Sequence, residues 1–184
     1  GGNIEADNFK QGGTNFTNSL LVGHATTGTL SAAIQNTGVG IAALDAITSA
    51  DNNTAVGMQS GSNITSSGNN TLVGKDSGRN VATGAGGNTY SGNSTGFYNA
   101  TGVYNVGIGF NTLVGASGQS NSYNTAVGAT SSAAMTTGVS NITIGSASGD
   151  NITSGDGNVI IGSIDADSAT GDKQLIVADG VDGS

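Results

Sequence analysis

The pentapeptide Asn53-Thr54-Ala55-Val56-Gly57 decides the fold, because close copies of it follow one another along most of the chain. The glycines that close these copies stand at positions 23, 40, 57, 74, 92, 109, 128, 145 and 162, so the steps are 17, 17, 17, 18, 17, 19, 17 and 17 residues. A fixed period of this length is typical of solenoids, in which each repeat forms one coil that stacks on the next. The asparagine, the fourth residue and the glycine of the clearest copies are Asn53, Val56 and Gly57; Asn70, Val73 and Gly74; Asn124, Val127 and Gly128; Asn141, Ile144 and Gly145; and Asn158, Ile161 and Gly162.

Each copy also carries a weaker segment eleven residues after its asparagine, as in Ile64-Thr65 and Ile152-Thr153. Two short extended pieces per repeat, joined by Gly, Ser and Asn turns, indicate a coil of a β-solenoid, because a helix needs a longer stretch of 3.6-residue periodicity. Side chains alternate along a strand, and we expect Thr54 and Val56 to face the inside of their coil. The sequence therefore predicts an all-β, parallel β-solenoid of about nine coils of 17 residues.

The closing glycines and the motif asparagines form two columns, and each column leads to a further prediction. The closing glycine allows a sharp turn with positive φ, which glycine accepts without steric cost. Stacked coils place the asparagines from Asn36 to Asn158 one above another, so we expect their side-chain amides to form a hydrogen-bonded ladder.

The predicted core is thin, because each coil offers only three or four small apolar side chains for 17 residues. We therefore expect another copy of the chain to bury additional surface. Leucine and isoleucine side chains at positions that would point outward support this association; they are Leu21, Leu72, Leu113 and Ile160.

Charge and composition exclude several classes of function. The net charge is −8 and the four basic residues are dispersed, so nucleic acid and anionic membranes are not expected partners. No apolar run approaches the roughly 18 residues of a membrane span. No acidic residue lies between Asp76 and Asp150, and the single histidine, His24, suits a surface or turn position. Asp165, Asp167 and Asp172 are expected to form a solvated acidic tail, so we predict no catalytic, cofactor or metal-binding residues.

The repeats resemble two known kinds of surface protein. Asn52-Asn53-Thr54-Ala55-Val56-Gly57 and Asn158-Val159-Ile160-Ile161-Gly162 are similar to the head repeats of trimeric autotransporter adhesins, and the 17-residue spacing resembles bacteriophage tail-fibre shafts. This resemblance covers residues 19 to 180. It implies a homotrimer on a virion or another extracellular surface, in contact with other virion or fibre proteins and a host surface glycan. The three chains would form separate left-handed β-rolls or interleave into one triple β-helix.

The resemblance and the repeat divide the chain into a connecting segment (1–18), the solenoid (19–162) and a C-terminal part (163–184). In the last part, Gln174-Leu175-Ile176-Val177-Ala178 is a continuous apolar run that predicts a buried strand rather than another coil. This strand would cap the solenoid. In tail fibres a similar stretch precedes a trimerisation chaperone that is removed after assembly, which is the alternative that the resemblance implies.

Aromatic residues gather where the repeat is irregular. Insertions in solenoids form loops that often bind ligands, and aromatic rings offer flat surfaces to sugars. The alternative is that these rings fill the wider coils that the insertions create. The candidate glycan contacts are Tyr90, Phe97, Tyr98, Tyr104, Phe110 and Tyr123.

These observations favour a structural and adhesive fibre segment over two alternatives. A cell-surface trimeric adhesin head shares the same repeats. An ice-binding solenoid would display ordered threonines, and Thr37, Thr54, Thr71, Thr89 and Thr125 form one column. Because Val106, Ile142 and Val159 interrupt that column, we expect it to face inward, which disfavours ice binding.

Overall fold

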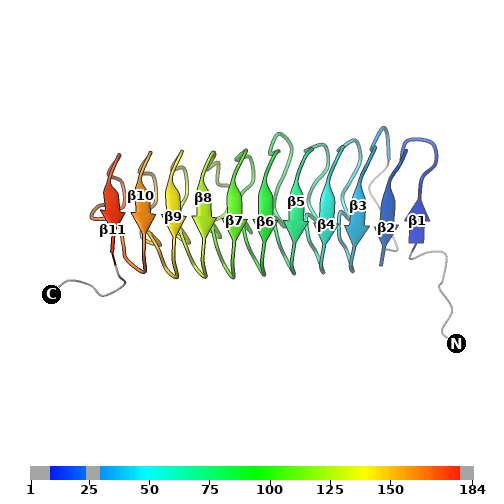
Figure 1. Ribbon diagram of the computed structural model, residues 1–184. Coiled ribbons are helices and arrows are strands. Elements are labelled where there is room, and N and C mark those ends of the chain that lie inside the picture. Colours follow the sequence, from blue (N-terminus) through cyan, green and yellow to red (C-terminus); the bar gives the residue numbers. More distant parts are fainter. Residues whose placement is uncertain (1–8, 24–29, 179–184) are drawn as a thin grey trace, which may run out of the picture.

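The computed structural model describes residues 9–23 and 30–178, and His24 lies outside them. The described chain is a rod built from one long sheet (Figure 1). Its strands are three residues long and follow one another in sequence order. They are β1 (Phe9–Gln11), β2 (Leu20–Val22), β3 (Thr37–Val39), β4 (Thr54–Val56), β5 (Thr71–Val73), β6 (Thr89–Ser91), β7 (Val106–Ile108), β8 (Thr125–Val127), β9 (Ile142–Ile144), β10 (Val159–Ile161) and β11 (Leu175–Val177).

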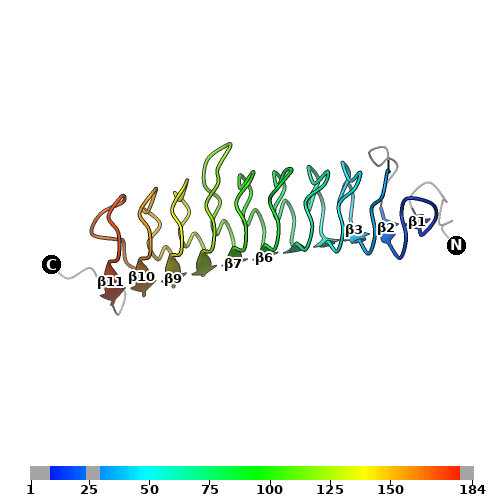
Figure 2. The ribbon, with the colours of Figure 1, turned by 90° about the horizontal axis from the view of Figure 1, so that it is seen from above.

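The strands from β2 to β11 are parallel, and equivalent repeat positions lie directly opposite one another. Thr54 pairs with Thr71 and Val56 pairs with Val73, for example. Seen from above, the strands line one side of the rod and the turns form the rest of each coil (Figure 2). The predicted parallel β-solenoid is confirmed. Each strand pairs with the next coil of the same chain, whereas an interleaved triple helix would place strands of other chains between them.

The asparagine ladder is present and runs through the interior. The backbone N–H and the Nδ2 of Asn53 both donate to Oδ1 of Asn36, at 3.0 and 3.1 Å, and Nδ2 also donates to the Ser67 carbonyl at 2.9 Å. The two contacts to Oδ1 of the preceding asparagine recur in each later coil up to Asn158. These asparagines are buried, and each satisfies buried amide groups of its neighbour.

This ladder determines which strand residues face inward. The prediction that Thr54 and Val56 face the inside of their coil was wrong. Asn53 is buried, alternation places Thr54 outside, Ala55 inside and Val56 outside, and the burial follows that order. Leu21, Leu72 and Ile160 occupy the same inward position as Ala55 and are fully buried, so they do not form an outward surface. An inward asparagine and an inward valine three residues later are incompatible in an extended strand.

In several coils the core compensates for the size of the third motif residue. Where the third motif residue is large, as in Leu72, the residue six positions later is small, as in Gly78. Where the third residue is glycine, as in Gly38, the later position holds Leu44. Leu113 stands in this second position, six residues after Gly107, and is buried there.

The closing glycines confirm the predicted turn and show an additional reason for it. Gly57 has a φ of 131°. A Cβ on Gly57 would lie 2.5 Å from the carbonyl oxygen of Gly74 in the next coil, so the coils approach too closely for any side chain.

At each end of the ladder, another residue type takes the place of the asparagine. At the start, the Ser19 hydroxyl accepts from the Asn36 backbone N–H in place of an asparagine. At the end, Gln174 donates from Nε2 to Asn158, while its Oε1 turns back to accept from the Ser168 backbone N–H. The strand after Gln174 is β11, which pairs in register with β10 and leaves Leu175 and Val177 exposed. The prediction of a buried strand outside the array was therefore wrong.

Candidate functional site

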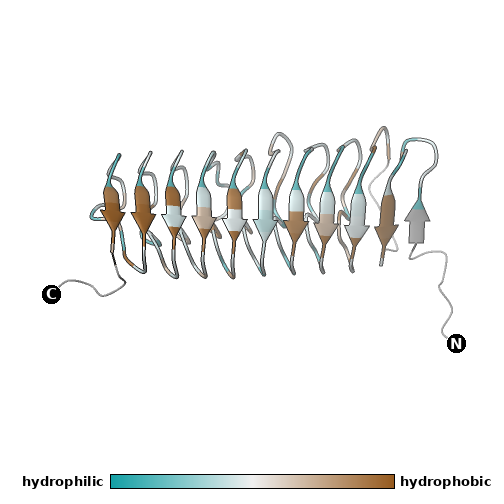
Figure 3. Cartoon of the chain, in the orientation of Figure 1, coloured by the Kyte–Doolittle hydropathy of each residue, from teal (hydrophilic) through white to brown (hydrophobic). Residues whose placement is uncertain are grey.

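The side of the sheet that points away from the core is nearly uniform and uncharged. We define the outward face as the first and third residues of each strand from β3 to β11. All of these residues are exposed or half-buried, and none carries a charge. Valine and isoleucine predominate in the third strand position. Figure 3 shows hydrophobic segments on many strands, such as β5, β7, β10 and β11, whereas β6 is pale. The exposed apolar residues of the outward face include Val39, Val56, Val73, Ile108, Ile142, Ile144, Ile161, Leu175 and Val177.

Further apolar side chains are exposed just beyond the ends of the strands. Ile41, Met58 and Phe110 each follow the closing glycine of their coil, and they are 69%, 40% and 55% exposed. Lys75 holds the equivalent position after β5.

The six candidate aromatic residues do not form one site. Tyr90 is the third motif residue of its coil and is fully buried, so it is a core residue. Its hydroxyl accepts a hydrogen bond from Nδ2 of Asn99 at 2.6 Å, and burial raises the pKa of Tyr90 above its ordinary value. This residue cannot contact a glycan in the folded chain.

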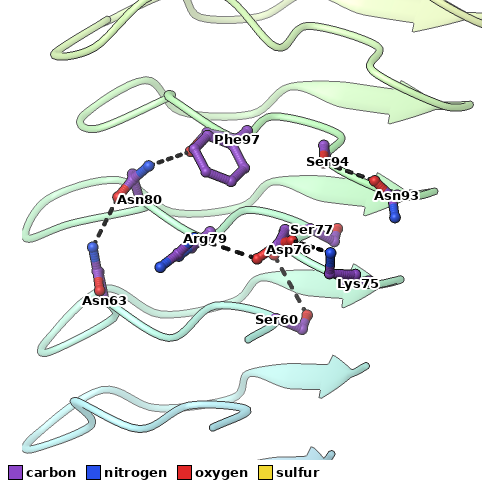
Figure 4. Close-up of polar contacts among 10 residues, drawn as sticks. All are labelled: Ser60, Asn63, Lys75, Asp76, Ser77, Arg79, Asn80, Asn93, Ser94 and Phe97. Atoms are coloured by element: carbon purple, nitrogen blue, oxygen red, sulfur yellow. Dashed lines mark hydrogen bonds and ion pairs between the residues drawn. The ribbon is translucent and has the colours of Figure 1, made fainter. Parts of the chain in front are cut away.

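Phe97 and Tyr98 lie on a turn together with the charged side chains of the preceding coil. Their rings meet edge to face, with centroids 4.6 Å apart, and the Arg79 guanidinium lies 5.5 Å from the centroid of Phe97. Arg79 also faces Oδ1 of Asp76 at 3.6 Å, and Lys75 faces its other oxygen at 3.4 Å (Figure 4). The two cations offset the charge of a carboxylate that is almost fully buried, although its Oδ1 accepts no hydrogen bond within the described residues.

Tyr104 and Tyr123 form a second pair, just before strands β7 and β8. Their rings are stacked, with centroids 5.4 Å apart and planes 25° from parallel, and both residues are more than half exposed. Phe110 lies at the other end of β7. The structure therefore brings together two aromatic pairs, and a glycan contact by any of the five outer rings stays a prediction.

One carboxyl pair was not anticipated. Asp150 and Asp165, in successive coils, share a hydrogen bond and line an open pocket of about 190 Å³ with Ala147, Ser163 and Ile164. Burial, followed by the hydrogen bond and negative charge of Asp165, raises the pKa of Asp150 to about 6. Two carboxyl groups in direct contact are closer than the separation of about 5 to 10 Å that glycoside hydrolysis requires.

A second polar column was also missed. Ser60, Ser77, Thr95, Thr112, Ser131 and Ser148 are buried, and each hydroxyl donates to a carbonyl at or next to the strand of the following coil. Their spacing, seven residues after each motif asparagine, is the signal that could have identified them.

Within the described ranges there is no group of three or more His, Cys, Asp or Glu side chains that could hold a metal ion. The same residues include no helix long and apolar enough to cross a bilayer. Comparisons with protein-family models, curated proteins and solved structures find no match to this chain. A solenoid of this kind is typical of structural proteins.

Proposed function

We propose that this chain is a rod segment of a homotrimeric fibre, in which three solenoids pack with their outward faces toward a common axis. The fibre would extend from a virion or another extracellular surface, join other fibre or virion proteins, and hold a receptor-binding element away from its base. The proposal assigns the chain a structural and adhesive role and no catalytic step.

The outward face carries this proposal. Soluble monomers rarely expose contiguous apolar patches larger than a few hundred Å². Here β-branched side chains without charge cover one side of nine strands, and Val56, Val73 and Ile144 alone are 38%, 40% and 40% exposed. At about 4.8 Å per strand the whole sheet is about 48 Å long. Association with identical copies is the simplest arrangement that covers a face repeating along the entire rod.

Mass measurement of the native assembly tests the proposal. We expect a trimer by analytical ultracentrifugation. Val56→Asp combined with Val73→Asp should convert it into folded monomers, because carboxylates would be buried without partners at the interface. Thr137→Asp adds a charge on an exposed turn and is the matched control, which should remain trimeric. A native chain that is monomeric at micromolar concentration contradicts the proposal.

The ice-binding alternative gains support from the orientation of the threonines. Thr37, Thr54, Thr71 and Thr89 point outward on four successive strands, and Val39, Val56 and Val73 accompany them on the same face. The spacing is about 4.8 Å between strands and about 7 Å along a strand, a regular grid of hydroxyl and methyl groups. The expectation that this column faces inward was wrong. A monomer that shows thermal hysteresis would favour this function, whereas a trimer without hysteresis favours the fibre.

The adhesin-head alternative predicts the same trimer. It differs only in the particle that carries the chain, and it is distinguished by the sequence that flanks this segment in its gene.

A further inference from the structure

The groove beside Tyr104 has the features of a small-molecule site. It has a volume of about 420 Å³, within the range of about 300–1,000 Å³ typical of ligand sites. It spans three successive coils just before the strands, and none of its residues belongs to the outward face. Its walls and floor include Ser66, Asn69, Gly84, Gly87, Val103 and Tyr104.

The ring of Tyr104 forms one wall of this groove and has two close neighbours. It stacks on Tyr123. It also lies against Gly87, where a Cβ would stand 2.5 Å from a ring carbon. The glycine thus makes room for the ring. Tyr104 is nevertheless 60% exposed, so a ligand can reach it.

The rest of the groove is uncharged and combines small apolar residues with a few polar ones. A Cβ on Gly84 would contact nothing within 4 Å, which shows open space above that backbone. Asn69 has an exposed side chain, and no hydrogen bond occupies its amide within the described part of the chain. The Ser66 hydroxyl has only a long contact of 3.5 Å with Thr83. Donors and acceptors therefore surround one flat aromatic surface.

We propose that this groove binds a neutral carbohydrate. A pyranose ring presents an apolar C–H face and equatorial hydroxyl groups, which match a tyrosine ring beside amide and hydroxyl side chains. Acidic sugars are disfavoured, because no basic side chain lines the groove and the net charge of the chain is −8, and no acidic side chain lines it to pair with a cationic sugar. The inference goes beyond the proposed fibre role and does not depend on the oligomeric state.

Substitutions that suit the local backbone conformation can test the groove. Tyr104 has a φ of 55°, and Asn52 and Asn69 occupy the same repeat position with φ of 59° and 63°. Tyr104→Asn therefore removes the ring while keeping a residue that the coil already accepts there. Asn69→Gly removes the amide without backbone strain. Asn52→Gly is the control, because it makes the same exchange at the same repeat position one coil earlier, outside the groove.

The experiment is native gel electrophoresis of the full chain in gels that contain dextran, galactomannan, mannan or arabinogalactan, followed by calorimetry with oligosaccharides of the polymer that retards it. We expect at least one neutral polymer to retard the native chain and Asn52→Gly equally. Tyr104→Asn should weaken binding at least tenfold, and Asn69→Gly several-fold, with unchanged thermal melts. Retardation by none of these polymers, or only by an acidic one such as alginate, overturns the proposal. Unchanged affinity of a folded Tyr104→Asn also overturns it. The mass of the native chain, measured separately, tests the fibre role independently.

Discussion

The inward position of each strand varies from coil to coil, whereas the last outward position of each strand hardly changes. The inward third position of successive repeats holds Leu21, Gly38, Ala55, Leu72, Tyr90, Gly107, Ala126, Thr143 and Ile160. The outward fourth position is valine or isoleucine in every strand from β3 to β11 except at Ser91. In several coils a turn residue compensates for the variation inside. Outside, identical residues such as Val56 and Val73 pair in register and pack side by side within one chain, and the surface that they still expose is what the proposed trimer would cover.

The largest expected effect comes from placing the same charge on either side of one strand. Ala55→Asp buries a carboxylate without a partner and should cost several kcal/mol, enough to unfold the rod. Val56→Asp adds the charge on the outward face and should leave the isolated chain folded. Thermal unfolding by circular dichroism, at a concentration where the chain is monomeric, compares the two. Equal destabilisation by both variants would contradict the assignment of the two sides.

A second test concerns compensation in the core. Leu44→Gly leaves a cavity and should lower the free energy of unfolding by about 2–5 kcal/mol. Gly38→Leu crowds Leu21, whose Cδ2 would lie 2.4 Å from the new Cβ, and should cost about 1–3 kcal/mol. The double variant reproduces the large–small order of Leu72 and Gly78. We expect its loss to be at least about 1 kcal/mol smaller than the sum of the single losses. Additive losses, measured by urea unfolding, would show that the two positions do not share one space.

The period, the glycine turn and the asparagine ladder follow from the sequence, because each depends on a residue type that recurs at a fixed position. The side of the sheet that faces the core does not follow from apolarity alone, since Thr54 and Val56 are as suitable for a core as Ala55. The ladder alone identifies the inward side of the sheet. Asn53 must lie inside to pair with Asn36, and the alternation of side chains then places Ala55 inside as well. The groove beside Tyr104 was not predictable, because it depends on Gly87 lying against a ring in the next coil.

The acidic pair at the C-terminal end should make that end sensitive to pH. The pKa of Asp150 is about 6 in the folded chain, against an ordinary value of 3.8. The folded state therefore binds the proton more tightly, and the stability present below about pH 4 is lost as the pH rises through 6. Amide hydrogen exchange around β10 and β11 should become faster between pH 4 and pH 7, after correction for intrinsic rates. Asp150→Asn should remove this dependence, and an unchanged pH profile in that variant would assign it to another group.

The smallest expected effect concerns a turn position with the same backbone in most coils. Thr130 has a φ of 57°, and β-branched residues rarely adopt this left-handed conformation. Asn111 occupies the equivalent position one coil earlier with a φ of 52°, and asparagine tolerates the conformation better. No hydrogen bond of the Thr130 hydroxyl within the described ranges would be lost. Thr130→Asn should therefore raise the free energy of unfolding by about 0.5–1 kcal/mol, measured by urea unfolding. Thr137→Asn, at an exposed turn residue without positive φ, is the control and should change stability little, because no left-handed strain is relieved there. An equal gain in the control would show that the backbone conformation is not the cause.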